Sequence, residues 1–296
     1  MSIFSALFEQ GKVYNFEQAF GVKDITTDAM QAAIKDWALL YYQTDATKEE
    51  DPCQRIPVAV VSKLTKTTFS EYKAVPAKQN ADYIETILRE LDAVRVKAMQ
   101  QALIGGQCYL KPVFGLTGLS FTVVSRGSYI PLGRDERDVI TDIGMAERTV
   151  EGRNYYTLLE RRRVDASGNL TIESKLYRSE TEQVLGYETS LNALEKYSNL
   201  VPELFLPGVG SIGLVPVRTP QENTVDGSPD PVSIYAPAAG LIHNINRNEA
   251  QMNREFENGR SRIVASADLL KTASSWTGSK FPTSTISPRR VPRAVP

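Results

Sequence analysis

The sequence predicts an α+β fold: a helical N-terminal part, an antiparallel strand-rich middle, then one long protruding helix and a disordered basic tail. Three observations predict it. Apolar residues recur every three or four positions over 27–42 and over 80–104, as along one face of a helix. Residues 140–190 carry strand patterns with hairpin signals, and residues 233–258 return to helical spacing. Helices and strands in separate stretches are typical of the α+β class.

Composition excludes several classes of protein. The 296 residues suggest one large or two modest domains, and 42% hydrophobic residues suffice for a folded core. No apolar run approaches the roughly 18–20 residues that cross a bilayer, and the first residues lack the early Lys or Arg of a secretory signal. Cys53, Cys108 and one histidine are too few for a disulfide framework or a structural zinc site. We therefore expect no membrane partner, metal or cofactor.

The first third contains the clearest helices. Over 27–42, Met30, Ile34 and Trp37 fall on one face, and a second long helix over 80–104 ends at Gly105-Gly106 because glycine readily adopts the left-handed conformation after a helix. Between them, 56–61 suggests a short helix with a proline in its first turn.

Strand patterns begin directly after these glycines. Residues 107–113 and 119–124 flank a glycine turn and predict a hairpin, in which Pro112 makes the first strand short or places it at an edge. Residues 141–149, 155–164 and 170–177 predict a meander of antiparallel strands.

The long helix over 233–258 has a narrow apolar seam and a polar opposite face. Such a helix lacks cover within its own sequence, so it needs another helix from a neighbouring subunit or from further chain. The predicted seam residues are Ile234, Ala238, Leu241, Ile245, Met252 and Phe256, and the polar candidates for facing a channel are His243, Arg247, Glu249, Arg254 and Glu257.

The net charge of −1 conceals an asymmetry. Residues 271–296 carry five basic residues and no acidic one, which leaves a formal charge of −6 on the first 270 residues. Residues 272–296 are also rich in Ser, Thr and Pro without helical or strand period, which predicts an irregular, disordered tail. Its sparse charges favour a solvated segment over a nucleic-acid-binding one.

Motifs that suggest catalysis or nucleotide binding do not fit their context. Gly208–Gly213 spells G-x-G-x-x-G, but Pro216 and Pro220 follow it and exclude the helix that a dinucleotide site needs, so we expect a glycine-rich loop. His243 has no hydrolase nucleophile motif to serve and is expected on a polar face or interface. The run Arg161–Arg163 is expected at a solvated strand end rather than in a phosphate site.

In the order of its elements, the chain resembles tailed-phage portal proteins of the SPP1-like family over roughly residues 20–271. No single motif is diagnostic; order and spacing make the case. The segments are Ile84–Ile104 running into Gly105-Gly106-Gln107-Cys108-Tyr109-Leu110-Lys111-Pro112, the strand-rich middle, Ser228-Pro229-Asp230-Pro231-Val232-Ser233-Ile234-Tyr235, Ile245-Asn246, and Glu255-Phe256-Glu257-Asn258-Gly259-Arg260-Ser261-Arg262-Ile263.

The resemblance implies a structural subunit without catalytic function, in a homo-oligomeric ring expected to be a dodecamer. Such a ring lies at the portal vertex of the virion capsid, after assembly in the host cytoplasm, and passes double-stranded DNA non-specifically during packaging and ejection. Its implied partners are the terminase large subunit and the head-completion or adaptor, scaffolding and major capsid proteins.

By order, residues 1–226 correspond to the wing, 227–259 to the first stem helix and 260–271 to the start of the clip. Family members continue well beyond this point, so a truncated portal is expected. The mildly acidic body suits a conduit, because each phosphate neutralised by a basic residue adds affinity for DNA.

Two other readings remain open. A hydrolase or transferase could use carboxylates in a cleft, with Asp135, Glu136 and Asp138 as the candidates. Alternatively, the chain is another phage adaptor or structural protein that binds partners through the long helix.

Overall fold

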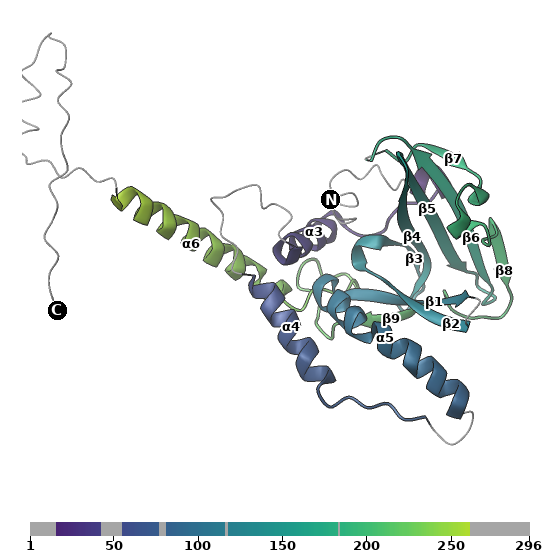
Figure 1. Cartoon of the computed structure of the whole chain (residues 1–296), viewed down its shortest axis with the longest axis horizontal. Coiled ribbons are helices and arrows are strands. Elements are labelled where there is room, and N and C mark those ends of the chain that lie inside the picture. Colours follow the sequence, from purple (N-terminus) through teal and green to yellow (C-terminus); the bar gives the residue numbers. More distant parts are fainter. Residues whose placement is uncertain (1–15, 43–54, 77–80, 116–117, 183, 261–296) are drawn as a thin grey trace, which may run out of the picture. The chain divides into compact units, whose positions relative to one another are not determined.

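The computed structural model describes residues 16–42, 55–76, 81–115, 118–182 and 184–260. They form the predicted α+β fold, with helices first, antiparallel sheets in the middle and a long helix last (Figure 1). The chain divides into two compact units, Met1–Ala250 and Gln251–Pro296, and the division falls inside this last helix. The predicted tail and the clip-like segment beyond residue 260 lie outside the described residues.

Four helices precede the first strand in the described part: α2 (Phe16–Phe20), α3 (Asp28–Tyr42), α4 (Ile56–Phe69) and α5 (Ala81–Gly105). The two long helices predicted from apolar spacing are α3 and α5. The backbone amide of Met30 donates to the Thr27 hydroxyl at 3.2 Å, so Thr27 caps α3. The helix predicted at 56–61 continues to Phe69, with its proline in the first turn as expected.

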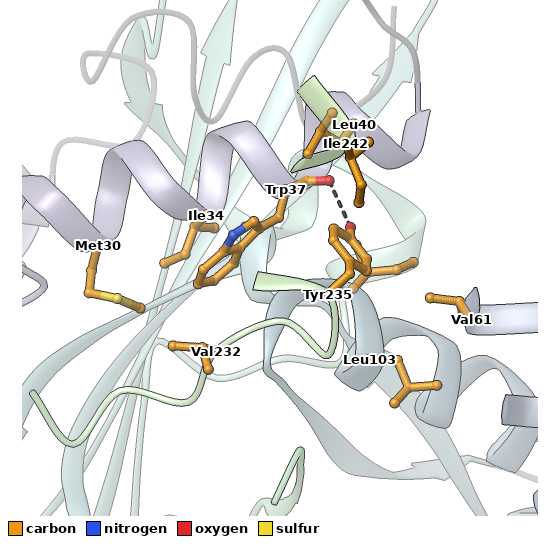
Figure 2. Packing of buried hydrophobic residues seen from close by; sticks show 10 residues of the cluster. Met30, Ile34, Trp37, Leu40, Val61, Leu103, Val232, Tyr235 and Ile242 are labelled. Atoms are coloured by element: carbon orange, nitrogen blue, oxygen red, sulfur yellow. Dashed lines mark hydrogen bonds between the residues drawn. The ribbon is translucent and has the colours of Figure 1, made fainter. Parts of the chain in front are cut away.

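A hydrophobic cluster joins these helices to a segment more than a hundred residues later in the chain. Figure 2 shows side chains of α3 gathered around Tyr235, whose hydroxyl donates to the backbone oxygen of Trp37 at 2.8 Å. That bond satisfies the polar end of a buried aromatic residue. The buried members of the cluster are Met30, Ile34, Trp37, Leu40, Val61, Leu103, Ile104, Val232, Tyr235 and Ile242.

A three-stranded antiparallel sheet follows α5. Its order is β2 (Gly118–Val124), β1 (Gln107–Gly115) and β9 (Val215–Arg218). The predicted hairpin is therefore confirmed, but the expectation that Pro112 makes its first strand short or places it at an edge was wrong, because β1 has nine residues and is the central strand. Strand β9 pairs only with Gln107–Leu110, so Pro112 lies beyond it and its missing amide hydrogen leaves no ladder bond unmade. Ala98 and Ala102 of α5 pack against Cys108 and Leu110 of β1.

The larger antiparallel sheet has the order β3-β4-β5-β6-β7, with β8 also paired to β6. Its three long strands confirm the predicted meander. The shorter ones, like β9, were not predicted. The six strands are β3 (Tyr129–Arg134), β4 (Ile140–Glu151), β5 (Asn154–Val164), β6 (Leu170–Ser179), β7 (Tyr187–Thr189) and β8 (Glu203–Leu206). Three-residue 3-10 turns are η1 (Arg126–Ser128), η2 (Leu191–Ala193), η3 (Glu195–Tyr197) and η4 (Ala236–Ala238).

The expectation of a solvated arginine run on β5 was wrong for two of its three members. Arg161 is buried and donates to both carboxylate oxygens of Asp142, at 3.1 and 2.6 Å. Arg162 is also buried, on the opposite face, and donates to Glu160 at 2.7 Å. Only Arg163 is exposed. Because β5 is an interior strand with both faces covered at this point, each buried guanidinium needs a carboxylate beside it.

Within the described residues, no helix is long and apolar enough to cross a membrane. The same residues contain no group of three or more His, Cys, Asp or Glu side chains that could hold a metal ion.

Candidate interaction helix

The long helix α6 (Ala239–Arg260) starts from a junction between α5, β1 and the chain segment 231–235. The Ser233 hydroxyl and the Ile234 amide both donate to the backbone oxygen of Leu103, at 3.0 and 2.9 Å. These bonds occupy a carbonyl in the last turn of α5, where no intrahelical donor is available. Thr219, next to the end of β9, donates from its hydroxyl to the Val232 oxygen at 2.6 Å and from its amide to the Gly106 oxygen at 2.9 Å.

The predicted start of the helix at Ser233 was therefore wrong. Ser233 and Ile234 use their polar groups on the end of α5, and η4 follows before α6 begins. Pro237 lies in this 3-10 turn, which fits its lack of an amide hydrogen. Ile234, the first predicted seam residue, precedes the helix.

In the first unit, α6 packs one face on the body of the protein. Ile242 is only 3% exposed and belongs to the cluster around Trp37 (Figure 2). Asn246 and Ala250, one and two turns later, are also buried. Leu241, by contrast, is 63% exposed. The buried face is thus centred on Ile242 rather than on the neighbouring Leu241 that we had placed in the seam.

His243 fixes α6 to α3 at the edge of this contact. Its Nε2 lies 2.8 and 3.0 Å from the two carboxylate oxygens of Asp36. Both side chains are partly exposed, so this contact adds little to stability on its own. Of the other polar candidates, Arg247 is exposed and Glu249 is half-buried.

In the second unit, residues 251–259 of α6 are all exposed. Met252 is 54% and Phe256 is 74% exposed, so both predicted seam residues here are uncovered. Arg254 and Glu257 are exposed as well. Of the remaining predicted seam residues, Ala238 and Ile245 are half-buried.

The acidic candidates for a hydrolase lie on the turn between β3 and β4. The Asp135 carboxylate accepts hydrogen bonds from the amides of Val139 and Arg137, at 2.8 and 2.9 Å. The bond from Val139, followed by the bond and charge of Arg137, outweighs desolvation and lowers the pKa of Asp135. Asp135 is therefore held ionised by its own turn and is poorly suited to act as a general acid.

The carboxylate of Glu160 is buried between two cations, Lys111 and Arg162. Desolvation raises its pKa, but the charges and hydrogen bonds of Lys111 and Arg162 outweigh this effect and leave the pKa below its ordinary value. The group is an internal ion-pair network between the two sheets, and its carboxylate oxygens are already engaged.

No family model matches this chain, and a search of curated proteins found no significant match. The order of the elements and the exposed side chains of α6 are thus the observations that bear on function.

Proposed function

We propose that this chain is a portal-type structural subunit, which associates with further copies of itself into a ring that passes double-stranded DNA into and out of a phage capsid. The observation that carries the proposal is the exposure of large apolar side chains of α6: Leu241 in the first unit, and Met252 and Phe256 in the second. Apolar side chains repeated along a helix are expected to find cover on a partner surface.

A second observation supports the proposal. The resemblance rests largely on the segment around Gly105-Gly106 and on the segment Ser228–Tyr235. These two segments, far apart in sequence, contact each other at the origin of α6, where Ser233 and Ile234 bond to Leu103. Their spacing in the sequence therefore has a physical meaning: together they fix where the long helix begins.

The exposed apolar side chains of α6 can contribute to an interface but do not suffice for one alone. Burying one fully exposed large apolar side chain contributes about 1.5–3 kcal/mol, so these three, which are already partly covered, supply less than roughly 9 kcal/mol together. Association costs about 4–15 kcal/mol in lost freedom, which leaves little surplus for one contact. In a closed ring every subunit has two neighbours and the assembly has no open ends, so the exposed side chains of α6 would pack on a different surface of the next copy.

The charges on α6 suit a helix that lies near DNA without binding it tightly. Arg247 and Arg254 stand against Glu249, Glu255 and Glu257, which leaves the helix near neutrality rather than with a basic stripe. Few phosphates would be neutralised, so affinity for passing DNA stays low. Terminase and the head-completion, scaffolding and capsid proteins are the partners that this proposal implies.

The test compares two adjacent residues of α6 in the full chain. Leu241→Asp places a charge at an exposed apolar position of α6 and should abolish assembly while the melting temperature stays close to wild type. Ile242→Asp buries an unpaired charge and should destabilise the fold itself, by on the order of 4 kcal/mol. Negative-stain microscopy and light scattering detect rings, and circular dichroism follows melting.

Rings of wild-type protein that Leu241→Asp disperses would support the proposal. A wild-type chain that stays monomeric at about 100 µM, well above the concentrations at which micromolar assemblies form, would contradict it. If rings still form in both the Leu241→Asp and the Phe256→Asp variants, α6 does not form the interface between subunits.

A further inference from the structure

A cavity of about 250 Å³ lies between the three-stranded sheet, the β3–β4 turn and the glycine-rich loop. Gln107 and Tyr109 of β1 line it together with their cross-strand partners Arg218 and Pro216 of β9. Directly paired residues project from the same face of a sheet, so the register brings these four side chains to one wall. A single water needs only about 10–15 Å³ of such space, so this cavity is large enough for an organic molecule.

The opposite wall is the loop Gly208–Gly213, whose motif we had set aside. Gly208, Gly210 and Gly213 have φ values of 70°, 69° and 67°, a left-handed conformation that favours glycine. The Gly210 amide donates to the Gly168 oxygen at 2.8 Å, and Arg162 donates to the Ile212 and Gly213 oxygens at 3.3 and 3.2 Å. The loop is therefore held in place, and the wall is preformed.

The arginines of the cavity differ in how fully they are neutralised. Arg134 is bonded to Asp230 at 2.6 Å. Arg137 reaches Asp135 only at 3.4 Å, and Asp135 already accepts two backbone amides. Arg218 pairs with no carboxylate among the described residues. Arg218 is thus the cavity arginine without a described carboxylate partner, and Arg137, although paired with Asp135, has further donors for an anion; the Asp138 carboxylate also lines the cavity.

The rest of the lining is largely apolar. Ile140, Val164, Ile212 and Leu214 line the cavity between the charged turn and the sheet. A free inorganic ion would leave this surface without a partner, whereas an ester with a ring or chain attached to its phosphate would cover it. A hydroxyl group on the ligand would suit Asp138, which can only accept hydrogen bonds when ionised.

We propose that this cavity binds a small phosphate ester. Arg218 and Arg137 hold the phosphate, and the organic part of the ligand packs against Ile140, Ile212 and Leu214. A guanidinium group presents a planar pair of donors that matches two phosphate oxygens. This site is independent of α6 and of the ring-forming role proposed above.

Isothermal titration of the full chain with AMP tests the proposal, with adenosine, ribose 5-phosphate and inorganic phosphate as comparison probes. We expect AMP to bind with one site per chain. Adenosine, which lacks the phosphate, should bind at least tenfold more weakly, as should inorganic phosphate, which lacks the organic part. Equal binding of adenosine, or no saturable binding of AMP up to millimolar concentrations, would overturn the proposal.

Two pairs of variants locate the site. Arg218→Gln should weaken AMP binding about tenfold or more, the loss expected for one charge-assisted hydrogen bond, while the exposed Arg163→Gln leaves it unchanged. Val139→Glu adds a negative charge at the cavity, and Val150→Glu adds the same charge at a similarly exposed valine outside it. Only the first of each pair should lose affinity. Wild-type affinity in both Arg218→Gln and Val139→Glu, with normal circular dichroism, would rule out this cavity.

Discussion

Two groups of arginines in this protein differ both in how closely they cluster along the sequence and in whether their charges are paired within the fold. Arg161 and Arg162 stand next to each other on β5 and form the most conspicuous basic cluster of the sequence, yet both are buried and paired within the fold. Arg137 and Arg218 are far apart in sequence and inconspicuous, yet both line one cavity with unused donors. Available charge therefore depends on the partners that the fold supplies, rather than on clustering along the chain.

The strand geometry explains the first group. Neighbouring residues of a strand point to opposite faces, so Arg161 and Arg162 enter two different environments. On one face Arg161 pairs with Asp142, and on the other Arg162 and Lys111 share the carboxylate of Glu160.

The largest effect is expected from Glu160→Ala. Removing this carboxylate leaves Lys111 and Arg162 without their shared counter-charge, and breaking a buried ion pair in this way costs roughly 3–5 kcal/mol. Urea unfolding followed by circular dichroism measures the loss. Glu151→Ala, at the exposed end of β4, is the matched control and should change stability by less than about 0.5 kcal/mol. Equal effects would mean that the network is not structural.

A smaller effect is expected from pH. The pKa of Glu160 in the folded protein lies below its ordinary value of 4.5, so its ion pairs stabilise the fold above that value and lose this contribution as the pH falls through the folded pKa. Wild-type urea midpoints should therefore drop below about pH 4.5 more steeply than those of Glu160→Gln, which cannot titrate at this position. Parallel profiles for the two proteins would contradict this assignment.

The smallest effect on stability is expected from Arg218→Gln. Because Arg218 is exposed and pairs with no described carboxylate, its loss should change the free energy of unfolding by less than about 0.5 kcal/mol. The same variant should lose phosphate-ester binding, so the substitution is expected to reduce binding without reducing stability. A destabilisation of 2 kcal/mol or more, far beyond the usual range for a surface substitution, would show that Arg218 is structural.

The long elements of this fold could be predicted because their apolar periods extend over many residues. The helices α3 and α5 and the strands β4, β5 and β6 all follow such patterns. The short β7, β8 and β9 could not be, since three or four residues carry no reliable period and β9 contains a proline.

The candidate sites depend on tertiary contacts that no local pattern encodes. Leu241 and Ile242 are adjacent and equally apolar, and only the position of the cluster around Trp37 decides that Ile242 is buried. The start of α6 shifted because Ser233 bonds to the end of α5 instead of capping a helix. The cavity combines segments near residues 107, 134, 210 and 229, none of which suggests a pocket by itself.

The close approach at Gly106 sets a limit on how this protein can vary. Its φ is +84°, and a Cβ atom added there would lie 2.3 Å from the backbone oxygen of Pro231. Any other side chain would displace the segment around Pro231 from the end of α5. The hydrogen bonds from Ser233 and Ile234 to Leu103 would then be lost. In a saturation mutagenesis library, this codon should therefore tolerate almost no replacement, whereas that of Gly240, where an added Cβ would meet open space, should accept many.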